Sequence, residues 1–190
     1  MATKIPPHNL KEIINGLVAL IDDPNISIDG LMEHVKGPDF PTAGLIMGMD
    51  GLKQAYETGR GKIKMRAKAH IETNKNGKDN IVITEVPFQT NKANLVEKIA
   101  DLVGQKKIEG LRDLRDESDK DGIRVVVETQ KDVVPEVILN QLYKHTQLQD
   151  TFGIILLALV DGVPKIMSLK TVLQHFVDFR HEIVVRRTEF

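Results

Sequence analysis

Six basic residues occupy alternate positions between Arg60 and His70 of this 190-residue chain. They are Arg60, Lys62, Lys64, Arg66, Lys68 and His70, and the residues between them are small or apolar. Side chains of a β-strand point alternately to its two faces. The segment is therefore predicted to be a strand that buries one face and lines up five permanent positive charges on the other.

Two interpretations fit this row of cations. Two residues of a strand rise by about 6.6 Å, which is of the same order as the phosphate spacing along one DNA strand, so the row would match a nucleic-acid backbone. The other interpretation is a solvated face whose charges pair with carboxylates on a neighbouring strand. No carboxylate interrupts the row before Glu72. The alternation alone favours the solvated face.

The composition limits how nucleic acid could be bound. A formal net charge of −1 excludes a globally basic protein, so binding would need cations segregated onto one face. The absence of cysteine excludes disulfides, thiolate catalysis and cysteine-ligated metal. The sequence shows no signal peptide, and no run approaches the roughly 18 apolar residues of a membrane helix. We expect a soluble, cytoplasmic protein without a membrane partner.

An acidic run is the other cluster whose residue types suggest chemistry. It comprises Asp113, Asp116, Glu117, Asp119 and Asp121. An EF-hand loop beginning at Asp113 would need ligands where Arg115 and Arg124 stand, so that calcium template fails. Interleaved basic residues predict a charged turn with internal ion pairs instead. We predict neither a metal site nor a catalytic residue in this chain.

The pattern of apolar residues predicts the elements of the first half of the chain. Apolar positions repeat at helical spacing over residues 10–21, with Asn9 as N-cap, and a second helix begins at Ser27. A turn-rich connector over 36–41 and a single helical turn over 52–56 precede the basic strand. Residues 74–78 carry Asn-Gly hairpin chemistry and lead into a return strand over Asn80–Val86.

The second half predicts an α+β fold. Strands are expected at 81–86, 108–112, 123–128 and 152–160, with helices at 91–106 and 133–145 between them. This β-α-β-β-α-β order is typical of a split βαβ sheet covered on one face by two helices, to which the β-hairpin is added. After a turn at 161–164, a helix over 169–190 carries a heptad-like apolar seam that ends on Phe190 without a cap, so we expect that helix to continue.

Several separated strings resemble the A subunits of bacterial type IIA DNA topoisomerases. They are Ile5-Pro6-Pro7-His8-Asn9-Leu10, Gly37-Pro38-Asp39-Phe40-Pro41-Thr42, Tyr56-Glu57-Thr58-Gly59-Arg60-Gly61-Lys62, Asn91-Lys92-Ala93, Arg115-Asp116-Glu117-Ser118-Asp119-Lys120-Asp121-Gly122 and Thr146-Gln147-Leu148-Gln149. The last string, with Phe152-Gly153-Ile154 after it, favours the gyrase branch over the topoisomerase IV branch. The resemblance covers the whole chain.

The resemblance implies an ATP-dependent enzyme that introduces negative supercoils by passing duplex DNA through a transient double-strand break. It implies a helical segment over 1–36, a tower domain over 37–168 and the start of a coiled-coil arm over 169–190. The implied partners are duplex DNA, the gyrase B subunit, and a second copy of the A subunit, with the bacterial nucleoid as the implied location. ATP and Mg²⁺ would be bound through the B subunit, with no cofactor in this chain. The catalytic tyrosine would lie in an upstream winged-helix domain, so this chain would be a fragment without cleavage activity.

The resemblance also reverses the interpretation of the basic row. Its five permanent cations, Arg60, Lys62, Lys64, Arg66 and Lys68, are predicted to hold phosphates of a flanking duplex. Engagement of all five would give a salt slope of about −4 to −5. Two alternatives remain open: an RNA-binding module, which would need stacking aromatics that residues 123–127 lack, and a structural or interaction domain.

Overall fold

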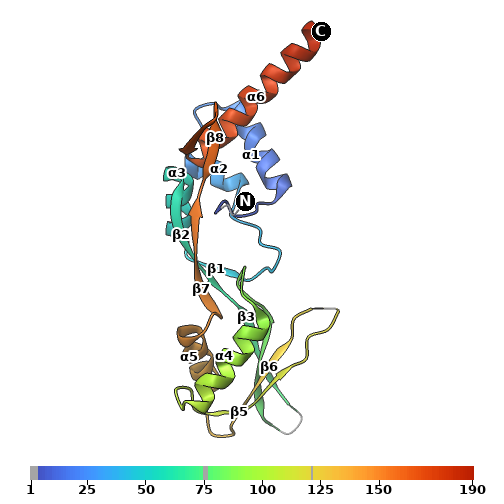
Figure 1. Ribbon diagram of the computed structural model, residues 1–190. Coiled ribbons are helices and arrows are strands. Elements are labelled where there is room, and N and C mark those ends of the chain that lie inside the picture. Colours follow the sequence, from blue (N-terminus) through green and yellow to red (C-terminus); the bar gives the residue numbers. More distant parts are fainter. Residues whose placement is uncertain (1–3, 75–76, 121) are drawn as a thin grey trace. The chain divides into compact units, whose positions relative to one another are not determined.

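A computed structural model of the chain describes residues 4–74, 77–120 and 122–190 (Figure 1). The chain divides into two compact units, each built from separate stretches. The first contains residues up to Phe40, Gly48–Ile63 and Phe152–Phe190, and the second contains Pro41–Met47 and Lys64–Thr151. As predicted, the fold is α+β.

The helices of the first unit are α1 (Leu10–Asp22), α2 (Ile28–His34), α3 (Asp50–Thr58) and α6 (Leu169–Glu189). Helices α1, α2 and α3 all contact α6. The predicted cap is confirmed, because the side chain of Asn9 accepts hydrogen bonds from the first turn of α1. The second helix was predicted to begin at Ser27, and that residue is its N-cap, whose side chain accepts a hydrogen bond from Gly30. The expected helical turn at 52–56 is longer than predicted, because α3 has nine residues.

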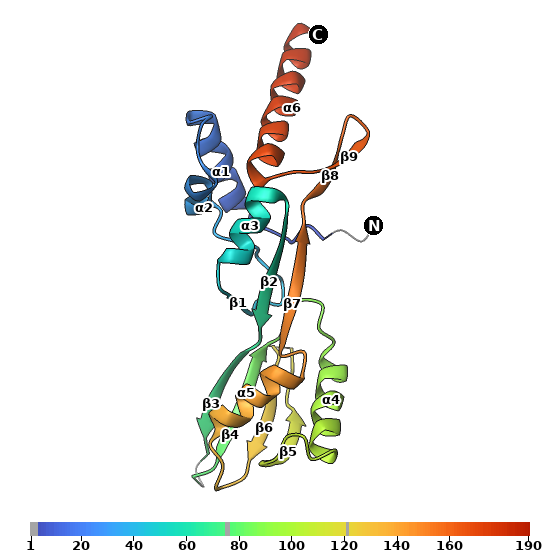
Figure 2. The same ribbon diagram turned by 90° about the vertical axis from the view of Figure 1, so that its left-hand side faces the viewer.

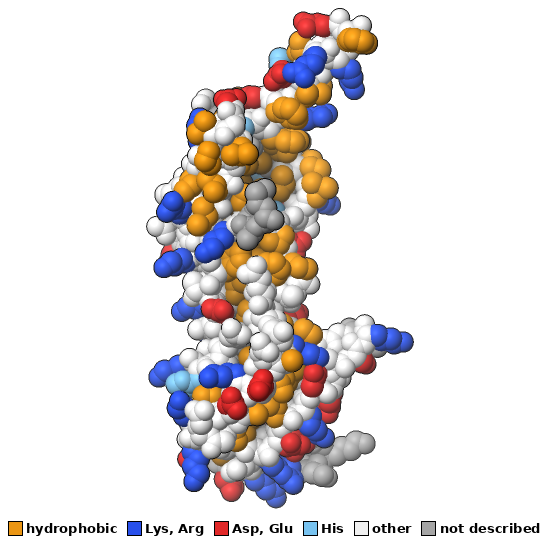
Figure 3. All heavy atoms as spheres, in the orientation of Figure 1, with side chains coloured by type: hydrophobic (Ala, Val, Ile, Leu, Met, Phe, Trp, Pro, Cys, Tyr) orange, Lys and Arg blue, Asp and Glu red, His pale blue; other side chains and the backbone are white. Residues whose placement is uncertain are grey.

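The apolar face of α1 is largely exposed. Gly16 and Leu20 are the buried positions of this helix, whereas Leu10 is 73% exposed and Ile21 59%. Figure 3 shows hydrophobic side chains at the surface of the first unit around α1. The heptad-like seam of α6 behaves similarly, since Leu169 is buried at its start and Phe179 is 54% exposed further along. Helical periodicity thus identified both helices but not which of their residues are buried.

The second unit contains a four-stranded sheet with the order β3-β4-β6-β5, visible in Figure 2. Its strands are β3 (Lys68–Thr73), β4 (Asp79–Glu85), β5 (Leu111–Asp116) and β6 (Val125–Thr129), and each neighbouring pair is antiparallel. Helices α4 (Lys92–Gly104) and α5 (Pro135–His145) pack on it. Asn91 caps α4, and Pro135 stands in the first turn of α5.

One face of this sheet forms the core of the second unit. The packed side chains are almost completely buried, and they come from β4, β6 and the two helices: Ile81, Ile83, Val125, Val127, Leu95, Ile99, Ile138 and Leu142. Alternate residues of the strands point to the other face. There charged side chains stand beside Val82 and Val126.

The two central strands of this sheet, β4 and β6, were predicted correctly, but its two edge strands were not. The strand expected at 108–112 lies at Leu111–Asp116, so the first part of the acidic run is a strand and not a turn. The strand expected at 152–160 does not join this sheet. It is divided into β7 (Gln149–Ile155) and β8 (Leu157–Val160), and β8 pairs with the unpredicted β9 (Val163–Ile166). The fourth position in the sheet is taken by β3.

Candidate nucleic-acid interface

The basic row begins on strand β2 (Arg60–Arg66) and shows the predicted alternation. Ile63 and Met65 are each only 2% exposed, and Ala67 after them is fully buried. The side chains of Arg60, Lys62 and Lys64 are exposed, and that of Arg66 is partly buried. The prediction of one buried face and one cationic face is therefore confirmed for this strand.

The row does not continue as one strand to His70. The chain leaves regular pairing at Ala67, so β2 belongs to a three-stranded sheet with β1 (Leu45–Met47) and β7, in the order β1-β2-β7, whereas β3 joins the four-stranded sheet. Arg60 and Lys62 fall in the first compact unit, and Lys64, Arg66 and Lys68 fall in the second. The hairpin prediction holds for β3 and β4, which pair from Lys68↔Glu85 to Thr73↔Asp79. Lys75 and Asn76 of the predicted turn lie outside the described residues.

The five cations differ in their partners. Within the described part of the chain, Arg60, Lys62 and Lys64 make no side-chain hydrogen bond or ion pair. Lys68 lies 3.2 Å from a carboxylate oxygen of Glu85. That carboxylate also accepts a 2.7 Å hydrogen bond from the backbone N–H of Gly44, which is the main reason its pKa is lowered. Lys68 is thus a weaker candidate for phosphate binding than Lys64.

Arg66 is fixed by two neutral groups. Its Nε and Nη2 atoms donate hydrogen bonds of 2.9 Å and 2.7 Å to the side-chain oxygen of Gln149. Its guanidinium carbon lies 4.6 Å from the centre of the Tyr143 ring, which is cation–π geometry. Sequence reasoning assigned no role to Tyr143 or to Gln149, although Gln149 closes the Thr146–Gln149 string.

The short strand β1 (Leu45–Met47) was not predicted, and it lies at the edge of the same sheet. In its antiparallel register Leu45 stands opposite Arg66, and Met47 stands opposite Lys64. Residues opposite each other in a sheet place their side chains on the same face. On β1, the neighbours of the cationic side chains are therefore two exposed apolar side chains and not carboxylates.

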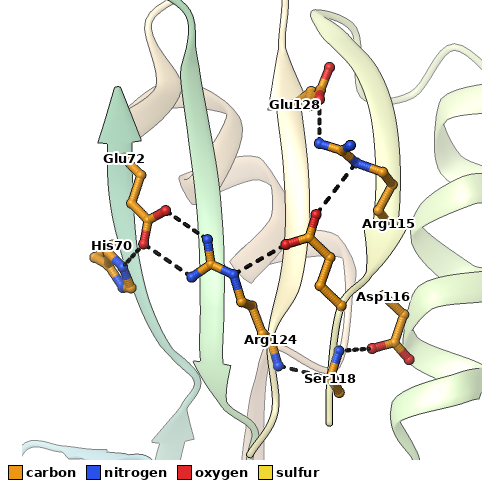
Figure 4. A network of polar contacts seen from close by, with 8 residues as sticks. His70, Glu72, Arg115, Asp116, Ser118, Arg124 and Glu128 are labelled. Atoms are coloured by element: carbon orange, nitrogen blue, oxygen red, sulfur yellow. Dashed lines mark hydrogen bonds and ion pairs between the residues drawn. The ribbon is translucent and has the colours of Figure 1, made fainter. Parts of the chain in front are cut away.

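By contrast, Arg115 of β5 and Arg124, which immediately precedes β6, pair with carboxylates of the same compact unit (Figure 4). Arg124 bridges Glu72 at 2.8 Å and Glu117 at 3.2 Å, and Arg115 pairs with Glu128. Hydrogen bonds from Arg124 and then from His70 lower the pKa of Glu72 to about 2. His70 contacts Glu72 at 2.8 Å, so it is engaged here and does not extend the basic row.

The acidic run makes internal ion pairs as predicted, with Arg115 lying 3.7 Å from Asp113 and 3.8 Å from Glu117, and it also pairs with residues outside the run. Asp116 pairs with Lys92 at 2.7 Å, and Glu117 pairs with Arg124, while Asp121 lies outside the described residues. The described residues form no cluster of three or more side chains of the kinds that hold a metal ion. Acidic and basic side chains are interleaved over the second unit in Figure 3. No helix in the described part of the chain is both long and apolar enough to cross a membrane.

Comparison with known proteins gives a consistent result over the full chain. The family model for the A subunit of DNA gyrase/topoisomerase IV matches residues 1–190. The chain is 61% identical over 190 residues to the DNA gyrase A subunit of Clostridium acetobutylicum, and it is 58% identical over 191 residues to that of Escherichia coli. These alignments cover 100% of this chain but only 23% and 22% of the two relatives. The chain belongs to the family of DNA gyrase/topoisomerase IV A subunits.

Proposed function

We propose that this chain is the part of a DNA gyrase A subunit that binds and positions duplex DNA. The observation that carries the proposal is the cationic face of β2, where Arg60, Lys62 and Lys64 are exposed and have no carboxylate partner among the described residues. A cation that is paired with a carboxylate inside the protein would have to break that ion pair before it could bind a phosphate. These three are available, and the family membership supports duplex DNA as the anion.

The proposed contacts confer affinity and register with little reading of sequence. Lysine and arginine side chains neutralise phosphates and release counterions, whereas base readout needs side chains inserted into a groove. The exposed cations are repeated at the two-residue spacing of a strand, which suits a backbone and not a base edge. The alternative of an RNA-binding module is not favoured, because the central strands β4 and β6 carry aliphatic residues where stacking aromatics would be needed.

We further propose that this chain has no cleavage activity of its own. Its two tyrosines are Tyr56 and Tyr143. Tyr56 is fully buried and lies 2.7 Å from the His8 ring, and burial raises its pKa. The hydroxyl of Tyr143 donates to the carbonyl of Ala67 at 3.3 Å, beneath the Arg66 side chain. Both hydroxyls therefore have structural partners, which argues against either as a nucleophile.

In the intact enzyme the proposed activity is ATP-dependent passage of duplex DNA through a double-strand break, which introduces negative supercoils. ATP and Mg²⁺ would be bound through the gyrase B subunit. The A subunit would act as a homodimer in the bacterial nucleoid. Within the longer protein we propose residues 37–168 as the tower domain, 1–36 as a helical segment preceding it and 169–190 as the start of the coiled-coil arm.

Fluorescence anisotropy with a labelled duplex across a salt series tests the DNA-binding proposal. The test variant changes Lys62, Lys64, Arg66 and Lys68 to glutamine. The control changes the same number of charges at exposed positions away from β2, namely Lys98, Lys107, Arg112 and Lys131. We expect tight binding at low salt, and a test variant whose slope of log K against log salt is reduced by up to about 3.6, at about 0.9 for each phosphate contact.

Two results would overturn the proposal: no binding by the unchanged chain at low salt, or equal affinities for the test variant and the unchanged chain. The first result would favour a structural or interaction domain. A separate plasmid assay tests the lack of cleavage. The chain mixed with ATP and the gyrase B subunit is expected to leave supercoiled plasmid unchanged, and a tyrosine-linked DNA product would contradict this.

A further inference from the structure

Arg66 is a partly buried cation with only neutral partners among the described residues. Gln149 accepts two of its hydrogen bonds, and its guanidinium carbon lies over the Tyr143 ring. Arg115 and Arg124, in the same compact unit, each contact carboxylates. Partial burial of a charge without a compensating charge is unfavourable. The arrangement at Arg66 is therefore one in which an anion from outside the chain would be stabilised.

The two neutral partners leave much of the guanidinium free. Arginine carries five N–H donors in a planar fork, and Gln149 accepts from one on Nε and one on Nη2. Three donors remain, including both on Nη1. A planar fork with free donors matches the oxygens of a phosphate in a bidentate manner.

The partners also restrict the motion of the Arg66 side chain. Gln149 holds one edge of the fork, and the guanidinium carbon packs over the Tyr143 ring. The Tyr143 ring is itself held by its hydroxyl, which donates to the carbonyl of Ala67, the residue next to Arg66. A long side chain fixed before binding loses less conformational entropy when the ligand arrives. The site is thus built for a defined contact.

The immediate neighbours of Arg66 favour an anionic ligand. Leu45 stands directly opposite on β1 and offers no charge. Lys64, two residues earlier on the same face of β2, is exposed and has no partner in the described part of the chain. The next cation along the chain, Lys68, is already paired with the carboxylate of Glu85.

We infer that Arg66 is a preorganised anchor for one DNA phosphate, and that Gln149 and Tyr143 are positioning residues that hold its guanidinium. The inference rests on the proposed DNA-binding function and identifies the residue that would fix the register of the backbone. The remaining cations of the row, Arg60, Lys62, Lys64 and Lys68, have exposed side chains and would add affinity without a defined geometry.

Salt-dependent anisotropy with the full chain and a labelled duplex tests the inference. In R66Q we expect the affinity ratio between 50 mM and 200 mM salt to shrink by about 3.5-fold, the contribution of one phosphate contact. R112Q is the matched control, because it removes the same charge from an exposed position in the same unit and should leave the ratio unchanged. R66K keeps the charge but not the fork, so it should retain the salt slope and bind more weakly.

Variants of Gln149 test the positioning role. Q149E places a carboxylate against Arg66 that competes with phosphate, so the salt slope should fall as it does in R66Q. Q149L removes the acceptor. As a single substitution it should weaken DNA binding, whereas adding it to R66Q should cause no further loss of affinity. A merely structural role of Gln149 would weaken both backgrounds alike.

The outcomes separate this inference from the proposed function. Absence of DNA binding by the unchanged chain would refute the proposed function and this inference with it. Binding that is intact, with R66Q no different from R112Q, would overturn the phosphate anchor and leave DNA binding to the lysines. If R66Q fails to fold, R66K and Q149E decide the question, and DNA affinity equal to that of the unchanged chain in both would overturn the inference.

Discussion

Gly61 of β2 lies against the backbone of Gly51 in the first turn of α3. A Cβ atom placed on Gly61 would be 2.2 Å from the carbonyl oxygen of Gly51, and one placed on Gly51 would be 1.9 Å from the carbonyl oxygen of Lys62. Neither glycine has a positive φ angle, so the backbone conformation by itself would allow other residues at both positions. Both are needed because the helix and the strand approach backbone to backbone, which supports β2 from the side of α3.

Gly61→Ala is expected to destabilise the first unit by about 1–3 kcal/mol or more, because the contact atoms are backbone and cannot rotate away. The free energy of unfolding measured in urea checks this. Gly153→Ala on β7 is the control, since a Cβ atom at that position would meet no other atom within 4 Å. Equal stabilities of the two variants would contradict the close packing of α3 on β2.

The ion pairs of Glu72 predict acid sensitivity. Arg124 and His70 hold the pKa of Glu72 at about 2, against 4.5 for the free side chain. The unfolded chain therefore takes up this proton first, and the stabilisation present above pH 4.5 is lost as the pH falls from there towards 2. Because Glu72 is 39% exposed, we expect a contribution of no more than about 1 kcal/mol.

Thermal unfolding of the E72Q variant between pH 7 and pH 3 tests that contribution. The variant should be less stable than the unchanged chain at pH 7 and should approach it at pH 3. E97Q changes the same charge at an exposed position of α4 and should follow the unchanged chain at every pH. A constant difference between E72Q and the unchanged chain across this range would contradict the prediction.

The His8–Tyr56 contact predicts a second pH dependence. The ring of His8 lies 2.9 Å from the carbonyl of Pro6 through Nδ1 and 2.7 Å from the Tyr56 hydroxyl through Nε2. In the neutral ring, Nδ1 donates to the carbonyl and Nε2 accepts from the hydroxyl. Burial lowers the pKa of His8, so protonation below about pH 6.5 favours the unfolded chain and stability falls with decreasing pH.

Tyr56→Phe should cost about 1–3 kcal/mol at pH 7, because it leaves the partly buried His8 nitrogen without a donor. Denaturant unfolding at pH 7 measures the loss. Thr151→Val removes an exposed hydroxyl from β7 and should change the stability by less than about 0.5 kcal/mol. A Tyr56→Phe variant as stable as Thr151→Val would show that the hydrogen bond to His8 contributes nothing.

Lys64 and Lys68 are expected to contribute unequally to DNA binding. Lys64 has no partner in the described part of the chain, whereas Lys68 must release Glu85 before it can meet a phosphate. K64Q should therefore make the negative salt slope about 0.9 less steep, and K68Q should change it by less. E85Q keeps an acceptor for the Gly44 N–H but frees Lys68, so it should make the slope steeper. A larger effect of K68Q than of K64Q would contradict this order.

Local chemistry made much of the fold predictable from the sequence. The cap Asn9 and the start of the second helix at Ser27 depend on hydrogen bonds and φ angles within a few residues, and the structure agrees with both predictions. The alternation of β2 was equally local. It required only that one face of a strand be buried, and Ile63 and Met65 are buried as predicted.

Partners distant in sequence could not be predicted in this way. Which strand completes the four-stranded sheet depended on β3 separating from β2 at Ala67, and nothing in the alternating pattern marks that position. The exposed face of α1 shows the same limit, because helical spacing gives an apolar stripe without saying what packs against it.

The basic row shows what each level of structure determined. The sequence by itself determined that five permanent cations lie at alternate positions, because side-chain direction in a strand follows from backbone geometry alone. Only the tertiary structure decided how they differ. It placed Glu85 beside Lys68 from 17 residues away and Gln149 beside Arg66 from 83 residues away. Whether a cation is neutralised, held in place or left free depends on those distant partners.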